Sequence, residues 1–405
     1  MSNGGSPRCR TVASDHNHTP AAGTVLSAFR SPRRELWGTD QALRIDLPAP
    51  WPDHIERVTE TLRGITTEDL VDTPGSGPVA FGALPFDRSA PATLVVPRVV
   101  HGRSVEGSRW LTTIDTGEAP PPRSAQSAQR TAATSVQITT HLSPEQWCDA
   151  VRQATERIGA GELTKVVLAR RLDVLSDAEF DAADLLNRLR QAHPAALCFA
   201  VDGFVGASPE LLVSRVGDMV RAQPMAGTTP RTGEPDADHS RAAELLASAK
   251  NRTEHQITID MVHDTLLPWC SFLDAEPSPS VVPAGPVQHL ATVVEGRLSR
   301  PAPTVLDLVA ALHPTPAVGG WPREAALRVI AQLEETDRGR YAGPVGWIDS
   351  RGNGAFAVGI RSVQLDGTRA RLFAGVGVVA DSVPEAELDE TRSKAQAVLG
   401  PLTRI

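Results

Sequence analysis

Residues 371–399 read RLFAGVGVVADSVPEAELDETRSKAQAVL, a strand pattern that passes within a few residues into a helix pattern. The first part, 371–379, is apolar, rich in valine and contains two glycines, which predicts a strand. Ser382 and Glu385 have the spacing of a capping box, so we expect a helix over about 383–399. The chain should therefore close with a strand that leads directly into a helix.

Three charged residues share one face of this predicted helix. Glu387, Glu390 and Lys394 lie at positions i, i+3 and i+7. On local geometry alone, a solvated ladder of ion pairs is the favoured interpretation. However, Gly375 and Gly377 in the preceding strand would let a substrate lie against the backbone. Too little chain follows these glycines for the second strand of a dinucleotide-binding unit, so that interpretation is excluded.

Upstream, predicted strands and helices occur in blocks rather than in strict alternation. This arrangement predicts an α+β fold with mainly antiparallel sheet. A helix N-terminus is expected at Ser143, where Pro follows and a Gln stands at N3. Strands are predicted at 165–174, 197–202, 210–216, 219–222, 345–349 and 355–363, and helices at 143–158, 182–192, 239–267, 304–312 and 322–334.

Composition divides the chain into four parts. Residues 1–24 are polar and without periodicity, which predicts disorder. Residues 25–117 alternate short apolar runs with turns and predict antiparallel strands. Residues 118–135, rich in Pro, Ser, Ala and Gln, predict a loop or linker. Residues 136–405 hold the patterns described above.

Charge and hydropathy limit the class of protein. The formal net charge of -8 argues against a nucleic-acid-binding surface, although a local site for a small anion stays open. No secretory signal pattern is visible, and no apolar run approaches the roughly 20 residues that span a bilayer. The four cysteines have neither the pairing nor the spacing of zinc ligands. We expect a cytoplasmic protein that binds no membrane.

Lysine is rare in this chain. Of 40 basic residues, only Lys165, Lys250 and Lys394 are lysines. A lysine can release its proton where an arginine cannot, so these positions merit attention, although mutational bias would give the same pattern. Lys165 begins a predicted strand, where it is either a general base or a charged residue that protects a sheet edge. The local sequence leaves both interpretations open.

Several carboxylates complete a possible reaction site. Glu210 opens an apolar strand and could be a general acid with a raised pKa. Glu254, in the long predicted helix, and Glu390, with Glu387 close by, would suit Mg²⁺, which binds one or two carboxylates and keeps other positions for water and substrate. An acid and a base together indicate the exchange of a leaving group for an activated nucleophile.

Seven segments now identify a family resemblance. In order, they resemble motifs of the chorismate-using enzymes of menaquinone, siderophore, tryptophan and folate synthesis, over about residues 140–400. Residues 25–115 match the variable N-terminal part of these enzymes only loosely. The matching segments are 206–212, 224–228, 254–255, 312–320, 340–343, 358–361 and 375–394.

The resemblance implies a fold and a set of ligands. The fold would be α+β, with two large, mainly antiparallel sheets packed together and helices outside, as in anthranilate synthase component I. Residues 136–405 would be the chorismate-binding catalytic region. The implied Mg²⁺ ligands are Glu254, Glu387 and Glu390, with the metal on the ring carboxylate of chorismate. The implied substrate-binding residues are Gly227, Thr228, His313, Arg361, Gly375, Gly377 and Lys394.

Two positions separate the branches of the family. Enzymes that use ammonia typically have Gln where this chain has Lys165, and aminodeoxychorismate synthases typically have a nucleophilic Lys where it has Ala226. The resemblance is therefore to the water-using branch. Lys165 would activate water for attack at C2, Glu210 would protonate the departing C4 hydroxyl, and isochorismate would form. No glutaminase subunit is expected. The protein is expected to be a monomer or a weak oligomer.

Other interpretations remain at this point. A salicylate synthase forms the same intermediate and then eliminates pyruvate, and a non-catalytic relative would only bind chorismate. An amidotransferase partner subunit is disfavoured by Lys165 and Ala226. Menaquinone and siderophore enzymes share these residues, so the sequence does not identify the pathway.

Overall fold

The structure is a computed structural model that describes residues 6–14, 27–117 and 134–404. Its strands form one continuous hydrogen-bonded sheet of 20 strands, folded back on itself, and a separate three-stranded sheet. The fold-back occurs at β6 (Ala92–Ser104), which pairs with both β3 (Arg34–Leu47) and β5 (Val79–Ala83). Two arms of sheet leave this junction, and they correspond to the two packed sheets predicted from the sequence.

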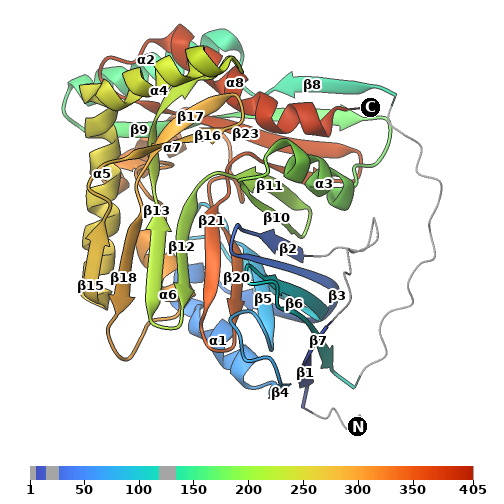
Figure 1. The fold of residues 1–405 in the computed structure, drawn as a ribbon. Helices are drawn as coiled ribbons and strands as arrows, with labels where there is room; N and C mark the ends of the chain where they lie inside the picture. Colours follow the sequence, from blue (N-terminus) through green and yellow to red (C-terminus); the bar gives the residue numbers. More distant parts are fainter. Residues whose placement is uncertain (1–5, 15–26, 118–133, 405) are drawn as a thin grey trace.

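The first arm contains the strand predicted at 371–379, which is β23 (Arg369–Val378). From β3 the arm continues by antiparallel pairing to β9, which also pairs with β8 and the short β19. In Figure 1, β9 and β23 run across the top of the molecule. The arm consists, in spatial order after β3, of β2 (Ser27–Arg30), β10 (Leu197–Val201), β11 (Phe204–Ser208), β22 (Ser362–Asp366), β23 (Arg369–Val378), β9 (Lys165–Ser176) and β8 (Val136–Thr140), with β19 (Gly320–Trp321).

The second arm leaves from β5 and forms the other wall. Its strands run vertically in Figure 1. In spatial order after β5 they are β20 (Pro344–Asp349), β21 (Gly354–Val358), β12 (Leu211–Val216), β13 (Met219–Gln223), β18 (Val294–Leu298) and β15 (Cys270–Ala275). The small sheet contains β14 (Met225–Pro230), β17 (Val287–Ala291) and β16 (Ser280–Ala284), and β7 (Arg109–Asp115), β1 (Arg8–Ala13) and β4 (Thr66–Asp69) extend from β6.

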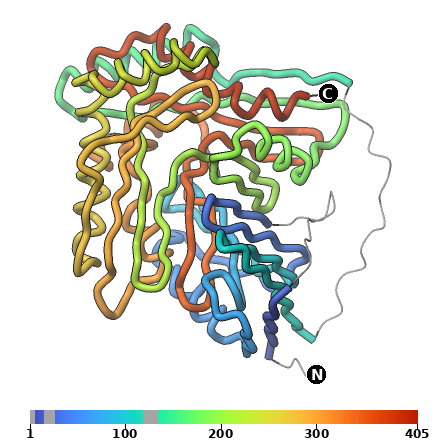
Figure 2. Tube along the Cα trace, viewed as in Figure 1, coloured from blue at the N-terminus to red at the C-terminus, as the bar shows by residue number. Residues whose placement is uncertain are grey.

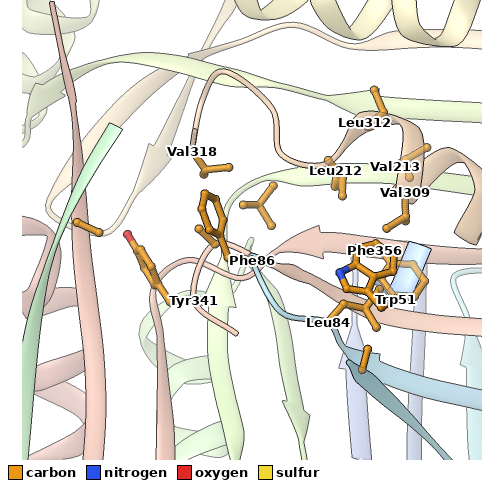
Figure 3. Packing of buried hydrophobic residues seen from close by; sticks show 14 of the residues in the cluster. Trp51, Leu84, Phe86, Leu212, Val213, Val309, Leu312, Val318, Tyr341 and Phe356 are labelled. Atoms are coloured by element: carbon orange, nitrogen blue, oxygen red, sulfur yellow. The ribbon is translucent and has the colours of Figure 1, made fainter. Parts of the chain in front are cut away.

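Apolar side chains fill the space between the arms and beneath the helices. Near the junction, Phe81, Phe199 and Trp347 are buried between strands of the two arms. A larger cluster lies under α6 (Val305–Leu312), where Figure 3 shows Val309 and Leu312 above Trp51 and Phe356. Removal of these surfaces from water, at about 25 cal/mol per Å², supplies most of the stabilising free energy.

Helices cover the outer faces of both arms. In Figure 2 the C-terminal helix α8 (Pro384–Leu402) lies beside the much earlier α2 (Pro144–Gly159). The capping box predicted at Ser143 is confirmed. The remaining helices are α1 (Glu56–Arg63), α3 (Ala182–Ala192), α4 (Pro235–Ala247), α5 (Ala249–Leu266) and α7 (Arg323–Leu333), with short 3-10 turns at Trp51–His54 and Leu267–Trp269. None of the helices in the described ranges combines the length and apolarity that crossing a membrane requires.

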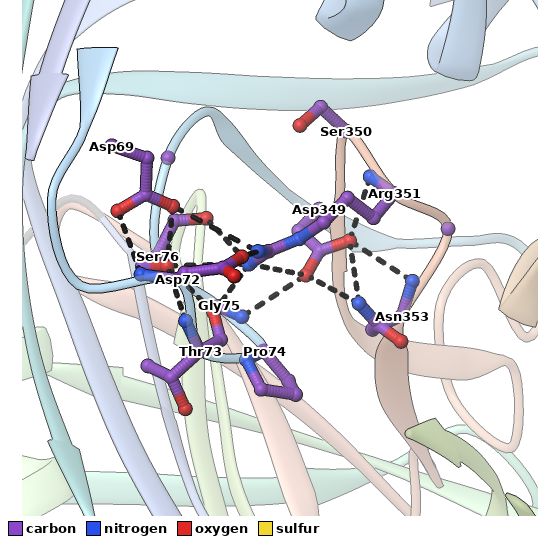
Figure 4. A network of polar contacts seen from close by, with 12 residues as sticks. Asp69, Asp72, Thr73, Pro74, Gly75, Ser76, Asp349, Ser350, Arg351 and Asn353 are labelled. Carbon is purple, nitrogen blue, oxygen red and sulfur yellow. Dashed lines mark hydrogen bonds and ion pairs between the residues drawn. The ribbon is translucent and has the colours of Figure 1, made fainter. Parts of the chain in front are cut away.

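A buried polar network joins the turn between β20 and β21 to the loop before β5 (Figure 4). Asp349 is fully buried and accepts hydrogen bonds from the backbone N–H of Gly75 and from Asn353. Arg351, in the turn, connects to the same loop, because its Nη1 donates to Oδ1 of Asp72 at 2.5 Å. Because a buried carboxylate without partners is costly, these bonds fix the outer end of the second arm and have a structural role.

Two predicted elements prove to be broken. The helix predicted over 239–267 is two helices, because Ser248 has an extended backbone and its Oγ accepts the N–H of Asn251 to cap α5. The strand predicted over 355–363 is β21 and β22, separated at 359–361. Arg361 there has φ +52°, a left-handed conformation that no strand contains.

The start of α8 also differs from the prediction. The capping residue is Val383, without a side-chain bond, so the predicted capping box of Ser382 and Glu385 is wrong. Ser382 Oγ instead accepts the N–H of Val379 at 3.1 Å, which closes the turn after β23. The helix then begins at Pro384, whose fixed φ suits the first helical position.

The predicted N-terminal disorder is wrong for Arg8–Ala13. This segment forms β1, which pairs with β7 and β4 and buries Cys9 and Thr11. Its alternation of buried and exposed residues was hidden in a polar composition. The rest of the 1–24 prediction falls largely on 1–5 and 15–24, and most of the predicted linker falls on 118–133. Those residues lie outside the described part of the chain.

Candidate active site

A cavity of about 270 Å³ lies between the first arm, the small sheet and the helices α5 and α8. All but one of the site residues predicted from the sequence line it. They come from segments far apart in the chain, which the folded-back sheet brings together. The lining includes Lys165, Glu210, Gly227, Thr228, Glu254, Arg361, Gly375, Gly377, Glu387, Glu390 and Lys394.

Lys165 lies at the bottom of the cavity, where β9 begins. It is buried, and its Nζ lies 2.5 Å from Oε1 of Glu254 on α5. Gly377 on the neighbouring β23 leaves the room for this pair, because an added Cβ would lie 3.0 Å from the Lys165 Cε and 3.1 Å from the Glu254 oxygen. Gly377 thus makes room for two side chains of the protein, and the predicted contact of its backbone with a substrate stays a prediction.

Burial and charge act against each other on Glu254. Burial alone would raise its pKa, but the charges of Lys165, Lys394 and Lys250, with the hydrogen bond from Lys165, together outweigh burial, and the net pKa lies below its ordinary value. Glu254 is therefore a carboxylate at neutral pH and can bind a cation.

Glu210 is a buried acid between β11 and β12. Its backbone N–H donates to Ser208 Oγ, and its backbone carbonyl accepts from the N–H of Val358. Burial raises the pKa of its side chain from 4.5 to about 8, against smaller lowering effects from the Met225 N–H and from Lys165. Glu210 is therefore protonated at neutral pH, as a general acid must be.

Arg361 enters the cavity from the break between β21 and β22. Its Nη2 lies 3.4 Å from the Nε2 of His289, and its buried Nε has no protein partner. Because Arg361 can only donate, His289 Nε2 accepts and the ring proton is on Nδ1. That Nδ1 lies 3.1 Å from both the Gly227 carbonyl and the Thr228 hydroxyl. The guanidinium retains a free, buried donor for an anionic ligand.

Burial, with a further contribution from Arg361, lowers the pKa of His289 to about 3, so the ring is neutral at any ordinary pH. His289 was not predicted from the sequence, because a single histidine in the apolar strand VQHLA resembles a core residue. Asn251, Tyr341 and Lys250 also line the cavity without having been predicted as site residues. Sequence signals existed for Lys250, as one of three lysines, and for Tyr341, which lies in the matching segment 340–343.

The charged face of α8 points into the cavity rather than into solvent. Lys394 Nζ donates to the Gly375 carbonyl at 2.9 Å and contacts Glu390 at 2.6 Å. The solvated ladder of ion pairs, favoured on local geometry, is therefore wrong. Burial raises the pKa of Glu387, against a lowering effect from a hydrogen bond with Ser382 and with a smaller rise from the charge of Glu390. Glu387 forms no ion pair among the described residues.

The three predicted metal ligands share this cavity but do not form a preassembled cage. No group of three His, Cys, Asp or Glu within the described ranges is close enough to hold a metal alone. The donors nevertheless suit Mg²⁺, which is bound by few carboxylates and completes its coordination with water and substrate. Glu387 and Glu390 are half-buried neighbours on α8, and a divalent cation would offset the repulsion between their charges.

His313 is the exception among the predicted residues and does not line the cavity. Its Nε2 donates to the Phe86 carbonyl at 2.9 Å, and the ring packs edge-on against Phe86. Because His313 caps the end of α6, its side chain points into the core between that helix and the second arm. Ala317 and Val318 of the same motif line the cavity instead.

Comparison with known proteins agrees with this geometry. A family model described as "Chorismate binding enzyme" matches residues 28–403. The chain belongs to this family. Isochorismate synthase DhbC of Bacillus subtilis is 39% identical over 354 residues, covering 84% of this chain and 85% of that protein. A putative isochorismate synthase, MenF of Mycobacterium tuberculosis, is 42% identical over 343 residues, covering 81% and 87%.

Solved structures of family members share the fold. The putative 2,3-dihydroxybenzoate-specific isochorismate synthase DhbC of Bacillus anthracis superposes with a TM-score of 0.80 at 34% identity, over 94% of this chain and 96% of that one. Anthranilate synthase component I of Streptococcus pneumoniae superposes with a TM-score of 0.71 at 22% identity, over 95% of each chain. The predicted architecture is therefore confirmed.

Proposed function

We propose that this protein is an isochorismate synthase, which converts chorismate to isochorismate by adding water at C2 and losing the C4 hydroxyl. The observation that carries the proposal is the pairing, in one cavity, of Lys165 with the protonated acid Glu210. Its relatives at 39% and 42% identity bear the same activity in their names.

The proposed reaction balances as an exchange of one water for another. Lys165 accepts a proton from water as its oxygen bonds to C2, and both ring double bonds shift, from C1–C2 to C1–C6 and from C5–C6 to C4–C5. The C4–O bond breaks, and Glu210 supplies the proton with which that oxygen leaves as water. Glu210 must therefore begin protonated, as a general acid. Lys165 must begin as a neutral amine in order to accept the proton of water.

This requirement bears on the contact between Lys165 and Glu254. An amine gains little from a carboxylate partner, whereas an ammonium gains much. Glu254 would therefore have to contact another cation, rather than Lys165, when Lys165 acts as the base. The 2.5 Å contact describes the resting ion pair rather than the reactive form.

Substrate carboxylates would be held by cationic groups that line the cavity. Arg361 offers its unpaired Nε and a planar fork suited to a carboxylate. Lys394 would be a second contact, and the backbone at Gly375 and Gly377 would lie against the ring. Mg²⁺, held by Glu254 and Glu390 with Glu387 assisting, would neutralise the charge of the remaining carboxylate.

Purified protein with chorismate and Mg²⁺ tests the proposal. Isochorismate should form without added ammonia. Anthranilate or aminodeoxychorismate would overturn the proposal, and salicylate with pyruvate, beyond spontaneous breakdown of isochorismate, would identify a salicylate synthase. An absence of turnover would indicate a chorismate-binding relative. The pathway, cytoplasmic location, weak or absent oligomerisation and lack of a glutaminase subunit stay predictions.

A further inference from the structure

All three lysines of the chain line the same cavity. Lys165 and Lys394 have roles in the proposed reaction, but Lys250 has none. It lies one helical turn before Glu254 on α5, so both side chains point to the same side of that helix. Its Nζ forms an ion pair at 2.9 Å with Asp381, which belongs to the turn between β23 and α8.

This ion pair spans the outer edge of the cavity. The side chains of Lys250 and Asp381 are 51% and 69% exposed, whereas that of Lys165 is 3% exposed. Figure 1 shows α5 along one side of the molecule and α8 across its top. The pair therefore connects the helix that supplies Glu254 to the segment that leads into the helix with the other two acids.

No second polar contact makes this connection. Among the described residues, no other hydrogen bond or ion pair joins α5 to the turn at 379–383 or to α8. In addition, α5 begins directly after the break at Ser248, so a continuous helix does not support its first turn. Besides the Ser248 cap and the contact of Glu254 with Lys165, the Lys250–Asp381 pair is thus the polar contact that ties this end of α5 to the turn before α8.

We propose that Lys250 and Asp381 form a latch that holds α5 and α8 at the separation at which their carboxylates serve one bound substrate. The latch rests on the proposed function, since it matters only if acids of both helices act together. The two are positioning residues that touch each other rather than the reacting atoms. An exposed pair contributes little to global stability, so its effect should be on substrate binding.

Kinetics of paired variants test the latch. Lys250→Met and Asp381→Asn should each raise KM for chorismate about tenfold and leave kcat within about twofold, since small misplacements weaken a multipoint site. The double variant should be no worse than either single one, because both remove the same contact. Lys250→Arg should stay within about twofold of wild type, and exchanging the two charges should recover most of the loss.

A matched control separates positioning from general surface charge. Arg297 and Asp218 form another exposed ion pair, at 2.8 Å, on the β12–β13 turn and β18, and neither residue lines the cavity. Arg297→Met should leave KM unchanged. The thermal unfolding midpoint of every variant should match that of wild type, which shows that KM changes do not arise from partial unfolding.

Two results would overturn the latch. One is an unchanged KM in Lys250→Met. The other is a lower KM in Asp381→Asn beside a higher KM in Lys250→Met, which would mean that Lys250 attracts the substrate directly. Equilibrium dialysis of the same variants gives the dissociation constant of chorismate. This constant shows the effect of the latch on substrate binding independently of turnover. Failure of the wild type to make isochorismate would count against the proposed function alone.

Discussion

The Nζ of Lys165 lies 2.5 Å from Oε1 of Glu254, and the missing side chain of Gly377 provides the space for both. The pair joins β9 of the first arm to the helix α5. It also means that one carboxylate lies within reach of both the proposed base and the proposed metal. The chemistry of the cavity therefore depends on which partner Glu254 contacts.

Lys165→Arg should abolish turnover, although it keeps the positive charge beside Glu254. An arginine cannot release its proton, so kcat should fall by about 10²–10⁴, as far as in Lys165→Ala. Steady-state kinetics give kcat, and equilibrium dialysis shows whether chorismate still binds. Near-wild-type turnover in Lys165→Arg would mean that another group is the base.

Activity should fall as the pH rises through about 8. Burial raises the pKa of Glu210 to about 8, so the acid is protonated below that pH and loses its proton above it. Glu210→Gln should lower kcat by about 10²–10⁴ and remove this alkaline limb. The pH profile of kcat in both proteins is the measurement. An unchanged alkaline limb in the variant would assign the ionisation to a different group.

Gly377→Ala should impair catalysis more than its size suggests. The new methyl group would lie 3.0 Å from the Lys165 Cε and 3.1 Å from Glu254 Oε1, so one partner must move. We expect kcat/KM to fall by about tenfold or more. Gly159→Ala, at the end of α2 with open space around it, is the control and should stay within about twofold of wild type. Equal activity of the two variants would contradict the tight contact.

Chelation of divalent cations should stop turnover, and Mg²⁺ should restore it. Glu390→Gln removes a charge from the proposed metal site while preserving its shape. The Mg²⁺ concentration for half-maximal activity should then rise by about tenfold or more. Calorimetric titration with Mg²⁺ in the presence of chorismate measures the same loss of Mg²⁺ affinity independently of turnover. If Glu390→Gln and wild type respond alike to Mg²⁺, Glu390 is not a ligand.

Much of the site could be predicted because its residues occur in short, ordered motifs. The strand and helix around Gly377 and Lys394 have strong local patterns, and the Ser143 cap specifies its helix from four residues. Features set by distant contacts could not be predicted. The break at Ser248 was missed for a different reason, because its bonds are local: Ser248 caps α5 inside a run that otherwise has the pattern of one helix.

Backbone conformation and side-chain direction account for the other differences. Arg361 occupies a left-handed conformation inside an apolar run that reads as one continuous strand. His313 stands in the motif that lines the cavity, but the end of α6 directs its ring into the core. His289 looks like a core residue until Arg361 is placed beside it. Each of these depends on a partner far away in the sequence.

The proposed addition of water at C2 is tested most directly by following the oxygen of the solvent into the product. The protein is incubated with chorismate and Mg²⁺ in water enriched in a heavy oxygen isotope, and the products are separated and weighed by mass spectrometry. We predict isochorismate that carries one oxygen from the solvent, and no such product from Lys165→Arg. Isochorismate without solvent oxygen, or a product that contains nitrogen from added ammonia, would contradict the account.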